Sequence, residues 1–206
     1  MVVGGKLPLS EGGEAALLLY EARENSLKSW KYKGIFFRHP DKDLGSLECP
    51  NFFKLNGQWI LIVSTYNKAE YFLGPWAAEE IEFIPVSHDL IDHSPNFYAT
   101  HGLIDDQGRI ILMAWLPGFM ASKSQSGLVI QPQSAGDWSL MKGQGWNGCM
   151  SLPRMLSLEN ESSLKLIQKP VTELQKLRQM HHHLTTDNAI KCQAETSTFA
   201  VEFIRL

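Results

Sequence analysis

The sequence has few cysteines and no long hydrophobic run. Its 206 residues include three cysteines, Cys49, Cys149 and Cys192, which are odd in number and widely spaced. This pattern indicates neither a disulfide framework nor a paired Cys-x-x-Cys zinc site, so we expect reduced thiols. Glycine, asparagine or charged residues interrupt every apolar stretch before the roughly 20 residues that a membrane-spanning helix needs. We therefore expect a soluble protein with no membrane partner.

An excess of positive charge is also lacking. The formal net charge is -3, the pI is about 6.2, and the lysines and arginines are scattered. Nucleic-acid binding is therefore not expected. The first residues, Met-Val-Val-Gly-Gly-Lys, lack the charged region and apolar core of a signal peptide. This leaves the localisation unknown, because the start resembles an internal segment for the reason given below.

Helical periodicity is scarce, and short β-rich runs bounded by Gly, Pro, Asn and Asp recur instead. Asn56-Gly57 between two apolar runs predicts a hairpin, because both residues tolerate the positive φ of a type I′ turn. Such hairpins indicate an all-β fold, either a propeller or a sandwich. The expected strands are Ala16–Glu21, Trp30–Phe36, Asn51–Leu55, Trp59–Ser64, Glu70–Leu73, Phe97–Ile104, Ile110–Trp115 and Cys149–Leu158.

The later part of the chain has a different composition. Residues Met120–Gly145 are rich in Gly, Ser and Gln and are expected to form a long loop. Val171–Met180 is a candidate helix or extended linker, and Ala194–Ile204 alternates like the first strand of another sheet. These patterns predict a domain boundary near residues 165–185.

Glu48 is a candidate for acid-base chemistry. It precedes Cys49-Pro50 and an aromatic strand, so a Pro-directed turn would hold it at a strand edge. Apolar neighbours there can keep a carboxyl group protonated, as a general acid requires. From these residues alone, a surface glutamate in a turn is the commoner alternative.

Several motifs together resemble one family. They are Glu-Cys-Pro at 48–50, Asn-Phe-Tyr-Ala at 96–99, Ile-Leu-Met-Ala-Trp at 111–115 and Gly-Trp-Asn-Gly-Cys-Met-Ser-Leu-Pro-Arg at 145–154. Their order and spacing resemble glycoside hydrolase family 32, the β-fructofuranosidase or invertase family. The resemblance implies hydrolysis of sucrose or a fructan by a retaining mechanism, without a metal or other cofactor, and with Glu48 as the acid/base.

The resemblance also implies a fold. Members have a five-bladed β-propeller with a funnel-shaped active site, followed by a β-sandwich. Residues 1–165 would supply the later blades, residues 166–185 the linker, and residues 186–206 the first part of the sandwich.

Two motifs that such enzymes need do not occur in the chain. These are Asn-Asp-Pro-Asn, which carries the nucleophile, and Arg-Asp-Pro, which carries the transition-state stabiliser. Met1–Gly5 resembles the strand after Arg-Asp-Pro, so we expect the chain to begin just behind that motif. Arg38-His39-Pro40 has His in place of Asp and falls in the wrong blade, so no role is assigned to it. We expect no fructose release by this chain, and self-association through open propeller edges. Asp92 is the first alternative nucleophile to test.

The substrate-binding candidates are Asn96, Trp115 and Cys49. Asn96 stands where many members have Asp, and it can bind a sugar hydroxyl but supplies no charge. Trp115 either stacks on a sugar or packs between blades. Cys49 either tunes Glu48 or is a small buried thiol. His101 stands where relatives have Lys or Gln, so substrate preference cannot be transferred.

Other residues favour structural roles. Trp146 and Arg154 are expected to fasten the last blade, and His181–His183 to pack in the linker, because consecutive side chains cannot easily share one metal. Two alternatives to a family 32 hydrolase stay open. One is a catalytically incompetent sugar-binding or assembly module, and the other is a different propeller glycosidase family.

Overall fold

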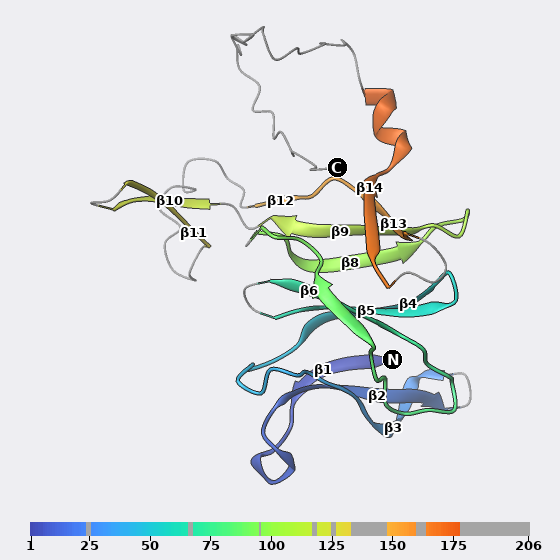
Figure 1. Cartoon of the computed structure of the whole chain (residues 1–206). Coiled ribbons are helices and arrows are strands. Elements are labelled where there is room, and N and C mark those ends of the chain that lie inside the picture. The colour runs from blue at the N-terminus through green and yellow to red at the C-terminus, as the bar shows by residue number, and fades with distance from the viewer. Residues whose placement is uncertain are drawn as a thin grey trace, which may run out of the picture. The chain divides into compact units, whose positions relative to one another are not determined.

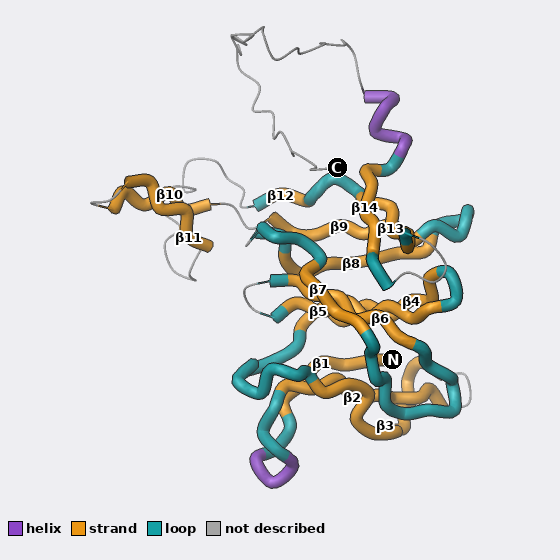
Figure 2. Tube along the Cα trace, viewed as in Figure 1, coloured by secondary structure: helices purple, strands orange, loops and turns teal. Residues whose placement is uncertain are grey.

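A computed structural model describes residues 1–23, 26–65, 68–94, 96–116, 119–124, 127–132, 148–159 and 164–177, with only the backbone path for 119–124 and 127–132. The chain divides into two units, Met1–Val171 and Thr172–Leu206. All described strands lie in the first unit and pair antiparallel, which confirms the all-β prediction (Figures 1 and 2). The described part of the second unit is the 3-10 helix η2 (Thr172–Leu177). Within these ranges, no helix has the length and apolarity that a membrane crossing requires.

The first sheet contains β1 (Val2–Lys6), β2 (Ala15–Arg23) and β3 (Ser26–Arg38) in that order, with the short helix η1 (Leu9–Glu11) between β1 and β2. Register shifts interrupt the pairing of β2 with β3 at three places. Among the described residues, no strand pairs with the other edge of β1.

The middle sheet contains β4 (Glu48–Leu55), β5 (Gln58–Ser64), β6 (Ala69–Gly74) and β7 (Ser87–Leu90) in sequence order. Asn56 and Gly57 connect β4 to β5 with φ values of 46° and 84°, which confirms the predicted hairpin. The run Ile60–Val63 is apolar at every position because β5 is buried on both faces.

The third sheet contains β8 (Tyr98–Ile104), β9 (Ile110–Leu116), β12 (Cys149–Met150), β13 (Arg154–Leu158) and β14 (Leu166–Pro170). Both β12 and β13 pair with β9, so they act as one interrupted strand. The predicted single strand Cys149–Leu158 is therefore wrong at Ser151–Pro153. At this break the Ser151 hydroxyl accepts the Ala114 N–H at 3.0 Å, in place of a backbone carbonyl.

The long loop expected at Met120–Gly145 is also wrong within the described residues. Strands β10 (Phe119–Ser124) and β11 (Gly127–Pro132) pair antiparallel as a separate hairpin. The Gly/Ser/Gln composition concealed a β-branched pair, Val129-Ile130, that suits a strand.

Two apolar clusters fill the spaces on either side of the middle sheet. Residues of the first and middle sheets form one cluster, which includes Leu17, Phe37 and Leu61. Residues of the middle and third sheets form the other, which includes Ile60, Ile62 and Leu112. The three sheets are thus stacked face to face in chain order, as Figure 1 shows. The prediction of four-stranded units holds for the middle sheet, while the first sheet has three strands and the third has five, of which β12 and β13 share one position beside β9.

Candidate functional site

Glu48 begins β4 at a β-bulge. It pairs with Ser64, whereas the next pair in the ladder is Asn51 with Ile62. Three steps along β4 therefore match two steps along β5, which leaves one extra residue in β4. Cys49, directly after Glu48, has a φ of 47°, in the left-handed region that side chains other than glycine rarely occupy. The bulge thus sets the direction of the half-buried Glu48 side chain.

Tyr98 begins β8 in the same way. It pairs with Trp115, and the next pair in the ladder is His101 with Met113. Ala99, directly after Tyr98, has a φ of 49°. The Tyr98 hydroxyl donates a hydrogen bond of 2.5 Å to Oε2 of Glu48. Two matching bulges, one in the middle sheet and one in the third sheet, therefore bring a carboxylate and a phenol together.

Trp115 lies beside this pair. It is the cross-strand partner of Tyr98 on β9, and its side chain remains 37% exposed. Gly148 lies close to the Trp115 side chain, because a Cβ added at Gly148 would stand 2.3 Å from the indole Nε1. Glu48, Tyr98 and Trp115 thus stand at one end of two neighbouring sheets, and the Trp115 indole offers an exposed, flat apolar surface at that end.

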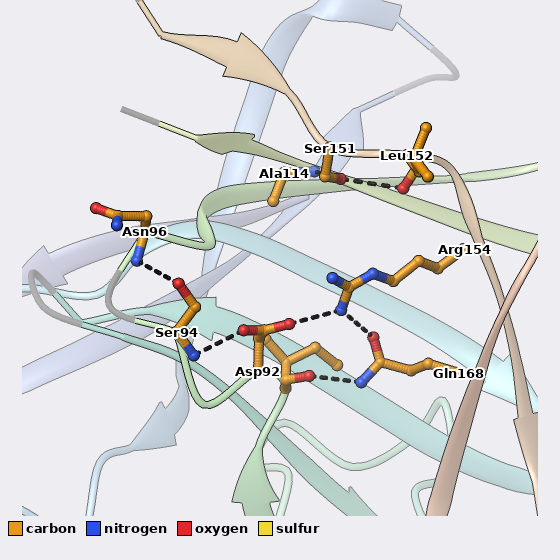
Figure 3. A network of polar contacts seen from close by, with 9 residues as sticks. Asp92, Ser94, Asn96, Ala114, Ser151, Leu152, Arg154 and Gln168 are labelled. Carbon is orange, nitrogen blue, oxygen red and sulfur yellow. Dashed lines mark hydrogen bonds and ion pairs between the residues drawn. The ribbon is translucent and has the colours of Figure 1, made fainter. Parts of the chain in front are cut away.

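The other two predicted binding residues have different surroundings. The Cys49 side chain is exposed, so it is not a buried thiol. Partial desolvation raises the pKa of this thiol, and the adjacent Glu48 carboxylate raises it further. Asn96 is only 2% exposed, and its amide atoms have no hydrogen-bond partner among the described residues. Figure 3 shows this amide pointing away from the neighbouring polar network.

In that network both carboxylate oxygens of Asp92, the alternative nucleophile, accept hydrogen bonds. One oxygen of Asp92 accepts the Ser94 N–H at 2.7 Å, and the other accepts a 2.7 Å bond from Arg154 (Figure 3). Arg154 also contacts Gln168 at 3.2 Å and covers the Phe97 ring at 4.2 Å. Arg154 therefore fastens β13 to the segment before β8, in agreement with the structural role expected from the sequence.

His39, from the Arg-His-Pro segment, belongs to a second buried network. Its Nδ1 accepts the Asp41 N–H, so Nε2 donates to Glu70 at 2.9 Å. Lys68 contacts the other Glu70 oxygen, also at 2.9 Å. Burial raises the pKa of Glu70, but the hydrogen bonds and charges of His39 and Lys68 outweigh burial and lower it to about 2. This network ties the end of β3 to the start of β6.

Sequence reasoning missed two residues of the site. Tyr98 stands inside the Phe-Tyr-Ala motif, two residues after the predicted binding residue Asn96. Asn51 follows Glu-Cys-Pro and connects the two bulges, which only the paired strands reveal. Within the described ranges, no group of three His, Cys, Asp or Glu side chains could hold a metal ion. Trp146 and His181–His183 lie outside the described residues.

Comparison with known proteins supplies the family. The family described as "Glycosyl hydrolases family 32 N-terminal domain" matches residues 1–170. A sucrose-6-phosphate hydrolase of Escherichia coli is 30% identical in an alignment of length 198 that covers 90% of this chain and 36% of that protein. A sucrose-6-phosphate hydrolase of Vibrio alginolyticus is 31% identical in an alignment of length 196 that covers 86% of this chain and 35% of that protein. The chain thus spans about a third of the length of these relatives.

Solved structures show the same fold. A Bombyx mori family 32 β-fructofuranosidase superimposes with a TM-score of 0.66 at 23% identity, covering 88% of this chain and 36% of that one. A sucrose-6-phosphate hydrolase from Lactobacillus gasseri gives a TM-score of 0.64 at 19% identity, covering 86% and 35%. The family match over residues 1–170 confirms the resemblance seen in the motifs, and the chain belongs to glycoside hydrolase family 32.

Proposed function

We propose that this chain carries the acid/base half of the active site of a retaining glycoside hydrolase that cleaves β-fructofuranosides, such as sucrose or a fructan. The observation that carries the proposal is the 2.5 Å hydrogen bond from Tyr98 to Glu48, at the end of two bulged strands. Trp115, the exposed cross-strand partner of Tyr98, would supply a stacking surface for a sugar ring. Relatives named as sucrose-6-phosphate hydrolases, a raffinose invertase and a levanase support this substrate class.

The geometry suits the role of Glu48 in such a reaction. A retaining glycosidase uses one carboxyl group as acid and then base, and a second, about 5 Å away, as nucleophile. Because Tyr98 donates to Oε2 of Glu48, the Oε1 atom is left to exchange a proton with the leaving oxygen and later with water. The nucleophile would come from the Asn-Asp-Pro-Asn motif, which this sequence does not contain. The reaction needs no metal or organic cofactor.

The fold that we propose for the whole enzyme is a five-bladed β-propeller followed by a β-sandwich. Residues 1–165 would form its later blades, 166–185 the linker and 186–206 the start of the sandwich. The consecutive stacking of three antiparallel sheets supports the first of these assignments. Asn96 and Cys49 are proposed to support the site without contacting the sugar. The Asn96 residue is buried, and Cys49 directly follows Glu48 in sequence.

A chimera tests the proposal. The region of the Escherichia coli sucrose-6-phosphate hydrolase that precedes the matched segment would be joined to this chain, to supply both aspartate motifs. Fructose release from sucrose, sucrose 6-phosphate and inulin is then measured. We expect Glu48→Gln to lower kcat by about 10²–10⁴-fold, the usual contribution of a general acid. The exposed Glu79→Gln is the matched control and should leave kcat unchanged. An active Glu48→Gln chimera would overturn the assignment.

A second candidate, sugar binding without turnover, is favoured by the lack of both aspartate motifs in this sequence. The isolated chain is then expected to release no fructose above a Glu48→Gln control, and to associate through open sheet edges on size exclusion. Titration with fructose, followed by tryptophan fluorescence and compared with Trp115→Ala, measures binding. Glu48-dependent turnover by the chain alone would contradict this candidate.

A further inference from the structure

Asn51 connects the two bulges on which the proposed site depends. Its side chain is 6% exposed on β4, between the middle and third sheets. Its Nδ2 donates to the Cys49 carbonyl at 2.8 Å and to the Thr100 carbonyl at 2.9 Å. Its Oδ1 accepts the Gly102 N–H at 2.9 Å. One amide therefore makes three hydrogen bonds, one within its own bulge and two across to β8.

These partners fix the orientation of the amide. Carbonyl oxygens can only accept and a backbone N–H can only donate, so the nitrogen must face Cys49 and Thr100. A β-bulge interrupts the ladder and leaves backbone groups without a strand partner, and buried groups of this kind need another partner. The carbonyls of Cys49 and Thr100 lie within the two register shifts, so Asn51 satisfies a carbonyl of each bulge at once.

The position of these bonds links them to Glu48 and Tyr98. Cys49 directly follows Glu48 and is itself the left-handed residue of the first bulge, and Thr100 directly follows Ala99, the left-handed residue of the second bulge. We propose that Asn51 is a positioning residue that locks the two bulges in register, so that the Tyr98 hydroxyl meets the Glu48 carboxylate. This inference rests on the proposed role of Glu48 in the reaction.

The consequence is a coupling that a purely structural amide would not produce. If Asn51 holds the register, the Tyr98–Glu48 bond exists only while Asn51 is present. Removal of the Tyr98 hydroxyl then has an effect in the native chain and no added effect once the Asn51 amide is gone. Residues in one hydrogen-bond network show such non-additivity, whereas independent residues do not.

Hydrogen exchange of the full 206-residue chain tests this prediction without any activity. Exchange is measured in peptides covering residues 47–53 and 96–104 for Tyr98→Phe, Asn51→Leu and the double variant. We expect Tyr98→Phe to speed exchange severalfold in the native background and to add nothing in the Asn51→Leu background. Gln168→Met is the matched control, because it also removes an amide that contacts a backbone carbonyl, that of Ile91, and because this amide bonds with Ile91 and Arg154 rather than with a residue of either bulge. In that background Tyr98→Phe should keep its full effect.

If the increases in exchange rate caused by Asn51→Leu and by Tyr98→Phe multiply in the double variant, the two residues act independently. That result would overturn the proposal. If Asn51→Leu does not fold, Asn51→Asp carries the same test, because an ionised carboxylate lacks both donors but keeps the shape and the acceptor for Gly102. Failure of this test leaves the chimera assay of Glu48 unaffected, so the two proposals are distinguishable.

Discussion

The middle and third sheets both begin with a bulged strand, but their third strands differ. Glu48 and Tyr98 each precede an extra residue with left-handed φ, and each pairs with the site end of the following strand. The third strand of the middle sheet, β6, is continuous and wholly buried. The corresponding strand of the third sheet is broken between β12 and β13, where a serine hydroxyl completes the ladder. Site geometry therefore depends on the first strands, and the sheets tolerate variation further out.

The two bulges also differ in what they present. The first displays a carboxylate, which can exchange a proton, and the second displays a phenol, which donates to that carboxylate. Matched substitutions in the two sheets can separate the contribution of the bulges to the free energy of unfolding from the contributions that are particular to each sheet.

The largest effect is expected where the first sheet meets the start of β4. A Cβ on Gly4 would stand 1.9 Å from the Leu47 carbonyl oxygen, a backbone atom that cannot move away alone. Gly4→Ala should therefore lower the free energy of unfolding by about 3 kcal/mol, the cost of severe overpacking. Gly5→Ala, whose nearest contact is 3.9 Å away, should change it by less than about 0.5 kcal/mol. Urea unfolding measures both variants, and equal losses would contradict the close approach at Leu47.

A smaller loss is expected from Glu70, a buried carboxylate on β6 of the middle sheet. The pKa of Glu70 is lowered to about 2, so its ionised form stabilises the fold at neutral pH. This stabilisation, on the order of 2 kcal/mol, is complete above the unfolded pKa of about 4.5 and is lost as the pH falls toward 2. Urea midpoints of the native chain should fall over that interval, while Glu70→Gln should start lower and fall less. Parallel pH profiles would exclude Glu70 as the source.

Ser151→Ala should cost about 1–2 kcal/mol, because it leaves the buried Ala114 N–H without the hydroxyl that accepts it. Ser64→Ala makes the same chemical change in the middle sheet, at a fully buried serine whose hydroxyl has no partner among the described residues. It should change the free energy of unfolding by less than about 0.5 kcal/mol. If both serines cost the same, the hydroxyl at the break does not replace a ladder carbonyl.

Local signals in the sequence predicted the parts of the fold that depend on local chemistry. Asn56-Gly57 predicted its hairpin because the turn conformation depends on those two residues alone. The bulges at Cys49 and Ala99 were not predicted, since neither residue is a usual choice for positive φ and tertiary contacts hold both. The Asn51 bridge and the break at Ser151 join residues far apart in sequence, and no period or spacing reports such contacts. Family motifs singled out Glu48 as the acid/base candidate, but only the paired strands showed that Tyr98 reaches it.

The smallest changes in the free energy of unfolding should come from Cys49 and Ala99, the residues with left-handed φ. The sign of each change distinguishes the possible causes. Replacing Ala by Gly in an ordinary strand costs about 0.5–1 kcal/mol, because glycine loses more backbone freedom on folding. At positive φ this cost is offset by relief of the Cβ clash, which is worth about 1–2 kcal/mol. Cys49→Gly and Ala99→Gly should therefore be neutral or slightly stabilising in urea unfolding. Ala22→Gly, on β2 and without positive φ, should be destabilising. If one of the two glycine variants is more stable than the native chain and the other is less stable, the two bulges are not equivalent. The side chain at the destabilised position then contributes packing that glycine removes.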